Sequence, residues 1–243
     1  MKLTVLGCGD AFGNGGRSNT SFLLTHENEH ILVDCGASAL IRLKHEQIDP
    51  DEISTIIISH FHGDHYGGIP FLLISSLFEK KRIATLNIAG PPGIEAKVLH
   101  LLEAMYEGTT EKLNQLDLRF YEYMEGTSLV IDDKKIEVWK VEHSIPSNPH
   151  GVRITWKGRV FAYSGDTSWT ENLIPLSNNA DIFLCDCNFL NSPAFGHLSL
   201  KELNERKEFI NCDNIWLTHM GSEVLESDDS TFNRLKDGIR IEY

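Results

Sequence analysis

The sequence lacks any apolar stretch long enough to cross a membrane, and its start lacks a long apolar segment before a small-residue cleavage site. Its five cysteines are scattered and odd in number, which does not indicate a disulfide framework in a chain of 243 residues. Internal repeats, low-complexity runs and linker-like shifts in composition are also missing. These absences predict one globular domain, residues 1–243, in the cytoplasm.

Positive charge is scarce as well, because 22 Lys and Arg stand against 35 Asp and Glu, for a formal charge of −13. Affinity for long nucleic acids comes mainly from cationic side chains that displace counterions. The basic run Lys80-Lys81-Arg82 follows an expected helix, so we interpret it as a solvated helix end. RNA is therefore a disfavoured partner.

Short apolar runs alternate with amphipathic stretches, which predicts a mixed α/β chain with more strands than helices. Strands are expected over residues 3–6, 21–24, 31–33, 55–59, 85–89, 135–141, 152–156, 160–163, 182–185 and 214–218. Helices are expected over residues 38–46, 64–78, 93–106, 199–207 and 228–236. Cys185 and Cys187 end one apolar run, which favours two buried thiols over a soft-metal pair.

Six of the expected strands lead directly to an aspartate or a histidine. These residues are Asp34, His60, His143, Asp166, Asp186 and His219. Side chains at strand ends lie on the rim of a sheet, where α/β proteins place many functional groups. For any one of the six, a strand simply meeting water is the favoured reading, but together they predict a shared site.

The segment from His60 to His65 places four potential metal ligands, His60, His62, Asp64 and His65, within six residues. A chance occurrence of this pattern is expected only about 0.003 times in a chain of this composition. Asp64 also suits an alternative role as the N-cap of the helix that follows. The segment predicts a metal site.

The segment can serve two ions. His60 and His62 can face one ion, while Asp64 and His65, beyond Gly63, can turn toward a second ion. The remaining ligands are expected from three of the strand-end residues, with a carboxylate bridging the ions: His143, Asp166 and His219. Mixed imidazole and carboxylate ligands suit Zn²⁺ first, then manganese or iron.

The glycine-rich start, from Gly7 to Gly16, has neither the glycine order nor the following helix of a nucleotide-binding loop. We expect it to form a turn at the edge of the site.

The metal motifs carry a family resemblance. The segment His60 to His65, then His143, Ser164-Gly165-Asp166-Thr167 and Thr218-His219, resembles the successive motifs of the metallo-β-lactamase superfamily. Further segments resemble its tRNase Z-like branch over nearly the whole chain: Gly7-Cys8-Gly9, Arg17-Ser18-Asn19, Val33-Asp34-Cys35-Gly36, Gly68-Ile69-Pro70 and Gly90-Pro91-Pro92-Gly93. The resemblance implies a four-layer αβ/βα sandwich with the metals at one edge, and a homodimer.

The resemblance also implies roles for individual residues. One ion would be held by His60, His62, His143 and Asp166, and the other by Asp64, His65, Asp166 and His219. Asp34 would support the site from behind, or it would simply begin the turn at Cys35-Gly36. His197 would face the substrate phosphate as acid or oxyanion stabiliser, or would be an ordinary loop histidine. Asp186 would pair with His197 as a catalytic residue, although the branch usually has the longer Glu there.

The expected reaction is hydrolysis of a phosphodiester by a metal-bridging hydroxide, with Asp64 and His197 assisting. tRNase Z-like endonucleases commonly carry a long arm for tRNA between the His and Asp motifs. Here only 22 residues separate His143 from Asp166, which favours a small or cyclic-nucleotide phosphodiester. The alternatives are a tRNA 3′-processing endonuclease, a thioester or lactone hydrolase, and a metal-holding binding module without catalysis.

Overall fold

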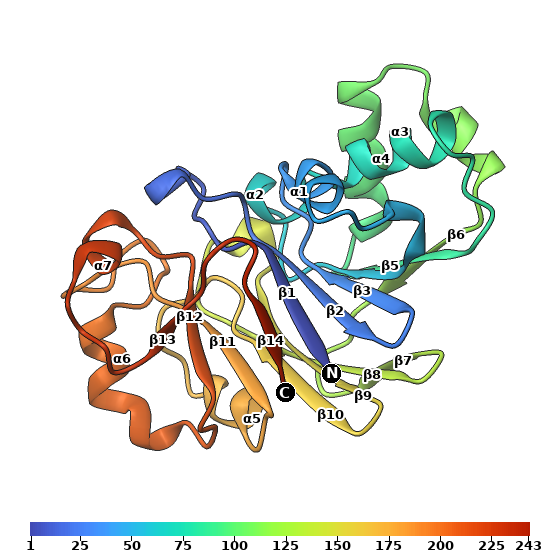
Figure 1. Ribbon diagram of the computed structural model, residues 1–243. Helices are drawn as coiled ribbons and strands as arrows, with labels where there is room; N and C mark the ends of the chain where they lie inside the picture. Colours follow the sequence, from blue (N-terminus) through green and yellow to red (C-terminus); the bar gives the residue numbers. More distant parts are fainter. The chain divides into compact units, whose positions relative to one another are not determined.

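The computed structural model describes all 243 residues, and the chain divides into two compact units (Figure 1). The first unit comprises Met1–Gly7, Ser18–Tyr123 and Asp237–Glu242, and the second comprises Cys8–Arg17, Met124–Lys236 and Tyr243. Each unit contains one seven-stranded sheet. That the whole chain forms a single domain stays a prediction.

The sheet of the first unit has the strand order β14-β1-β2-β3-β4-β5-β6. Its strands are β1 (Lys2–Gly7), β2 (Ser21–His26), β3 (Glu29–Val33), β4 (Ile53–Ile57), β5 (Leu86–Gly90), β6 (Leu118–Glu122) and β14 (Arg240–Glu242). Pairing is antiparallel from β14 to β3 and parallel from β3 to β6. The central strands read as nearly continuous apolar runs, because parallel strands are buried on both faces.

The helices of the first unit pack on this sheet. They are α1 (Ala39–His45), α2 (Gly63–Tyr66), α3 (Ile69–Phe78) and α4 (Ile94–Met105), with 3₁₀ turns η2 (Pro50–Glu52) and η3 (Thr110–Gln115). Leu43, Leu73 and Val98, one from each of α1, α3 and α4, share a buried core with Leu32 and Ile56 of the strands. Each such side chain contributes about 1.5–3 kcal/mol by leaving water.

The helix expected over residues 64–78 is interrupted in the structure, at Gly67 and Gly68. The backbone N–H of Gly68 donates to the carbonyl oxygen of Cys35 (2.8 Å) instead of continuing the helix. Pro70 follows in the first turn of α3, where a missing N–H has no cost. The break leaves α2 as a separate turn that carries Asp64 and His65.

The sheet of the second unit has the strand order β13-β12-β11-β10-β9-β8-β7. Its strands are β7 (Ser128–Ile131), β8 (Lys134–Lys140), β9 (His150–Trp156), β10 (Arg159–Tyr163), β11 (Ile182–Asp186), β12 (Ile215–Thr218) and β13 (Asn233–Arg234). Pairing is antiparallel from β7 to β10 and parallel from β10 to β13. The short connection after His143 holds one 3₁₀ turn and the hairpin of β9 and β10, as predicted.

The helices of this unit are α5 (Leu173–Ser177), α6 (Leu200–Arg206) and α7 (Ser222–Glu226), with 3₁₀ turns η1 (Asn14–Gly16), η4 (Ile145–Ser147) and η5 (Lys207–Phe209). Figure 1 shows α6 and α7 near the β12 and β13 end of their sheet. None of the helices in either unit has the length and apolar character that crossing a bilayer requires.

The helix expected over residues 228–236 is wrong, since this stretch is irregular and ends in β13. The carboxylate of Asp229 accepts the backbone N–H of Thr231 (2.8 Å), and the guanidinium of Arg234 donates to the carbonyl oxygen of Ser227 (2.8 Å). Such side-chain bonds to nearby backbone groups compete with helical hydrogen bonds.

The cysteines confirm the interpretation of buried thiols, because all five are free and buried. Cys185 and Cys187 belong to the apolar core of the second unit. Burial raises the pKa of the Cys185 thiol well above its ordinary value, so it stays protonated and apolar in character.

The interpretation of Lys80-Lys81-Arg82 as a solvated helix end is wrong for its last residue. Arg82 is buried, and its guanidinium donates to the carbonyl oxygens of Ala84 (2.8 Å), Thr85 (3.0 Å) and Ile53. Burial lowers the pKa of Arg82, and the carboxylate of Asp51, 3.8 Å away, opposes that effect. The side chain therefore ties the segment after α3 to the start of β4.

Replacing Arg82 by Met should lower the free energy of unfolding by about 2–4 kcal/mol, because several buried carbonyl oxygens lose their donor. Urea denaturation followed by circular dichroism measures this change. Lys81→Met is the matched control, since Lys81 is exposed and should change stability by less than about 0.5 kcal/mol. Equal stability of the two variants would contradict the role given to Arg82.

Candidate metal centre

In the first unit, the ends of two parallel strands bring Asp34 and Ser59 together. Asp34 follows β3, and Ser59 and His60 follow β4, at the same edge of the sheet. The buried carboxylate of Asp34 accepts hydrogen bonds from the backbone N–H and the hydroxyl of Ser59, both at 2.7 Å. It also accepts one from Nδ1 of His65 at 2.7 Å. Asp34 has a left-handed backbone (φ 54°), an uncommon conformation outside glycine.

The bond to Asp34 decides which ring nitrogen of His65 is available to a metal. With its proton on Nδ1, the lone pair of His65 is on Nε2, which lies 3.2 Å from Oδ2 of Asp64. The ring of His60 lies 4.1 Å from that of His65 and 4.8 Å from that of His62, measured between centroids. All four ligands expected from this segment therefore lie together.

In the second unit, three strand ends deliver the other expected ligands. β8 and β10 both run antiparallel to β9, so His143 and Asp166, which follow them, lie at the same edge as His219 after β12. Nε2 of His143 and Nε2 of His219 lie 3.9 and 3.3 Å from Oδ2 of Asp166. Two imidazole nitrogens and one carboxylate oxygen thus converge.

The loop that carries His197 also fixes His143. Nδ1 of His143 lies 3.0 Å from the carbonyl oxygen of Gly196, which leaves Nε2 for a metal. Position 196 requires glycine, because its φ is +80° and an added Cβ would lie 2.6 Å from Nδ1 of His143. The loop could not approach His143 so closely with any other residue.

His197 itself is held by a buried carboxylate. Its Nδ1 lies 3.0 Å from Oδ2 of Asp186, which also accepts the backbone N–H groups of Thr167 (3.1 Å) and Leu198 (3.3 Å). The ring of His197 is stacked on that of His219, with centroids 4.9 Å apart and an interplanar angle of 13°. The ligand atoms of Asp166, Asp186, His197 and His219 all lie within 4.8 Å of one another.

Within each unit the donor atoms fit divalent metal ions. Imidazole nitrogens and carboxylate oxygens are the ligands of Zn²⁺ sites, and metal-binding histidines usually donate their other N–H to a carboxylate or a carbonyl. His65 and His143 meet both conditions, through Asp34 and Gly196.

Three supporting groups were not predicted from the sequence: the hydroxyl of Ser59, the carbonyl of Gly196 and the carboxamide of Asn188, whose Nδ2 donates to the carbonyl oxygen of His219 (2.8 Å). Only Ser59 had a signal in the sequence, its place between a strand and His60. The other two act from loops whose path the sequence pattern does not reveal.

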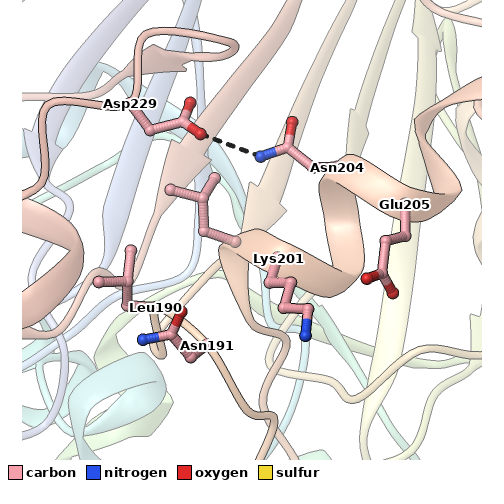
Figure 2. Close-up of a pocket in the computed structure, with 7 residues that line it drawn as sticks. Leu190, Asn191, Lys201, Asn204, Glu205 and Asp229 are labelled. Atoms are coloured by element: carbon pink, nitrogen blue, oxygen red, sulfur yellow. Dashed lines mark hydrogen bonds between the residues drawn. The ribbon is translucent and has the colours of Figure 1, made fainter.

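A cavity of about 350 Å³ in the second unit lies away from these ligands (Figure 2). It is lined by Leu190, Asn191, Leu200, Lys201, Asn204, Glu205 and Asp229. Figure 2 shows the side chain of Asn204 donating to Asp229, at 3.1 Å. None of the expected site residues lines it.

Solved structures share the fold over nearly the whole chain. The metallo-β-lactamase fold protein YhfI from Bacillus subtilis is 23% identical, and the likeness covers 99% of each chain with a TM-score of 0.79. The short form of human tRNase Z is 20% identical, with 100% of this chain and 99% of that chain covered and a TM-score of 0.80. These likenesses confirm the expected αβ/βα metallo-β-lactamase fold class.

Curated relatives define the class of protein. The probable metallo-hydrolase YhfI of B. subtilis is 25% identical over 226 residues, 90% of this chain and 87% of that protein. Ribonuclease Z of Methanococcus maripaludis is 34% identical over 163 residues, which span 66% of this chain and only 50% of that protein. The chain is a metal-dependent hydrolase with the metallo-β-lactamase fold.

A family model assigns the chain more narrowly than the class of metal-dependent hydrolases. The family model described as the anti-Pycsar protein Apyc1 matches residues 1–236, and the chain belongs to that family.

Replacing Asp34 by Asn should weaken metal binding about 10- to 100-fold, because an amide is a poor acceptor for His65 and would set an N–H against the donors of Ser59. Competition with a zinc-binding dye, followed by metal analysis, measures the affinity. Asp117→Asn is the control, since that exposed carboxylate pairs only with Thr85 and Arg119 at the surface. Unchanged affinity in Asp34→Asn would show that Asp34 only begins a turn.

Proposed function

We propose that the chain hydrolyses a small phosphodiester, with cyclic nucleotides as the preferred class, by means of two divalent ions, Zn²⁺ first. The observation that carries this proposal is the pair His197 and Asp186. A partly exposed imidazole, held on Nδ1 by a buried carboxylate and stacked beside His219, suits a group that faces a reacting phosphate.

The ligand sets are part of the same proposal. One ion would be held by His60, His62, His143 and Asp166, and the other by Asp64, His65, Asp166 and His219. The hydrogen bonds within each unit support this assignment, because Asp34 and the carbonyl of Gly196 leave Nε2 of His65 and His143 as the metal-binding nitrogens.

The ions, when bound, supply positive charge for the phosphate oxygens and lower the pKa of water toward neutrality. The chain's own residues supply orientation and a proton. Asp186 fixes the ring of His197 through Nδ1, so that Nε2 is the nitrogen that donates a proton to the departing alkoxide. Asp64 completes the set of acidic groups around the ions.

Several observations support a small substrate over a precursor tRNA. The 22 residues between His143 and Asp166 are taken up by η4, β9 and β10, so this connection has no long arm. The charge of −13 also opposes a polyanion. We place the enzyme in the cytoplasm, because its five free cysteines suit a reducing compartment. We propose a homodimer from the resemblance to the tRNase Z-like branch.

A substrate panel tests the proposal. The metal-loaded protein should hydrolyse bis(p-nitrophenyl) phosphate and 2′,3′- or 3′,5′-cyclic nucleotides, and a chelator should abolish this activity until zinc is restored. Precursor tRNA, thioesters and lactones serve as the competing substrates, with turnover measured under the same conditions. Activity confined to tRNA, or to thioesters and lactones, would overturn the proposed substrate class, and no activity at all would favour a binding module.

Replacing His197 by Ala should lower kcat on a poor leaving group about 10²- to 10⁴-fold, because the proton donor is lost while the ligands remain. The metal content should be unchanged, and KM should change much less than kcat. His100→Ala is the matched control, because His100 is exposed on α4. Loss of metal in His197→Ala would reassign His197 as a ligand.

A further inference from the structure

A second cavity of the second unit, about 410 Å³ in volume, has not been assigned a role. It is lined by Asp10, Phe12, Asn14, Asn188, Phe189, Phe195, Gly221, Ser222 and Glu223. The lining comes from three segments: the glycine-rich start, the loop before His197, and the turn after His219. Its volume is in the range of small-molecule sites.

Two exposed phenylalanines stand on the lining of this cavity. Phe12 is 88% exposed and Phe195 is 89% exposed, so neither contributes to the core. Phe195 also has a left-handed backbone (φ 52°), which is unfavourable for a bulky residue. A strained and exposed aromatic side chain lowers stability and solubility, so a ligand is the better account of its presence.

The glycine-rich segment is built to hold Phe12 in place. The carboxylate of Asp10, which is only 1% exposed, accepts the backbone N–H groups of Phe12 (3.2 Å) and Asn14 (3.1 Å). Nδ2 of Asn188 reaches the same carboxylate at 3.4 Å and also donates to the carbonyl oxygen of His219. The cavity is thereby connected to the backbone of an expected metal ligand.

The cavity also adjoins His197. The ring of Phe189 lies 6.4 Å from the ring of Phe195 and 6.4 Å from that of His197, measured between centroids. Phe195 is two residues before His197 in the same loop. A substrate whose leaving alkoxide faces His197 would therefore direct its remaining atoms toward Phe189 and Phe195.

We infer that this cavity binds the base of a nucleotide substrate, with Phe195 and Phe12 as the stacking surfaces. This inference rests on the proposed phosphodiesterase function and names the part of the substrate that the metal centre leaves undefined. Nucleobases stack on aromatic side chains whatever their sequence. The carboxylate of Glu223, which also lines the cavity, suits an amino-bearing edge of a base as hydrogen-bond donor.

The test compares two substrates that differ only in the base: adenosine 3′,5′-cyclic phosphate and ribose 3′,5′-cyclic phosphate with hydrogen in place of the base. Phe195→Ala should lower kcat/KM for the nucleotide about 5- to 100-fold, since one stacked base is lost. It should change kcat/KM for the abasic compound less than about 2-fold. Phe195→Trp should restore the preference, because indole stacks at least as well.

Phe12→Ala supplies a second variant from a separate segment, and Phe78→Ala is the matched control on α3, where Phe78 is 57% exposed in the other unit. Thermal unfolding and metal content should be the same for all variants. The base site is refuted if Phe195→Ala and Phe12→Ala lower kcat/KM equally for the nucleotide and the abasic compound, or lower it for neither.

Binding of adenosine, which has no phosphate, separates this inference from the proposed function. Saturation-transfer NMR should show contact between the adenine protons and the wild-type protein, and Phe195→Ala should weaken it. If adenosine binds in this way but no phosphodiester is hydrolysed, the proposed function fails and the base site stands. If cyclic nucleotides are hydrolysed but adenosine binding ignores Phe195, the base site fails alone.

Discussion

The buried carboxylate of Asp34 is the constraint on which the geometry of the segment from His60 to His65 depends. It satisfies the hydroxyl and the N–H of Ser59, at the end of one strand, and Nδ1 of His65, in the turn of α2. A buried carboxylate is costly unless such donors surround it. The backbone N–H of Cys35, the next residue, donates to the carbonyl oxygen of His65 (2.6 Å), so the same turn is fixed twice. One carboxylate therefore sets both the position and the tautomer of a histidine that is proposed as a metal ligand.

Histidine rings of the second unit are also oriented by hydrogen bonds, but to different acceptors. Gly196 orients His143 through its carbonyl, and Asp186 orients His197 through its carboxylate. Asp166 and Asp186 are both buried and lie within one cluster of ligand atoms. Buried carboxylates gathered with imidazoles suit a site that holds divalent ions.

The strand-end residues and the pattern from His60 to His65 could be predicted, because a ligand cluster at the end of a buried strand leaves a local mark in the sequence. The break at Gly67 and Gly68 could not be predicted, since it depends on a hydrogen bond from Gly68 to Cys35, which lies 33 residues earlier in the chain. The burial of Arg82 could not be predicted for the same reason, because two of its partners are the carbonyl oxygens of Pro50 and Ile53, in another segment. The spacing of apolar residues predicts which face of a helix or strand is buried. It does not predict features that depend on hydrogen bonds between distant segments.

Asp186 holds Nδ1 of His197 although its side chain is one methylene shorter than the Glu that the tRNase Z-like branch usually has at this position. Asp186 is the last residue of β11, and its backbone N–H donates to the hydroxyl of Ser164 (2.8 Å), which fixes its position. The backbone N–H of Leu198 donates to the Asp186 carboxylate, so the loop is drawn toward it at the residue next to His197. The path of this loop, with its left-handed glycine at Gly196, brings His197 within reach of the aspartate. The cost falls on Phe195, the residue before that glycine, whose left-handed backbone accompanies the turn. The segment that orients His197 is therefore also the one that presents an aromatic ring to solvent, so the position of the proposed acid and the position of the proposed base site are set by one loop.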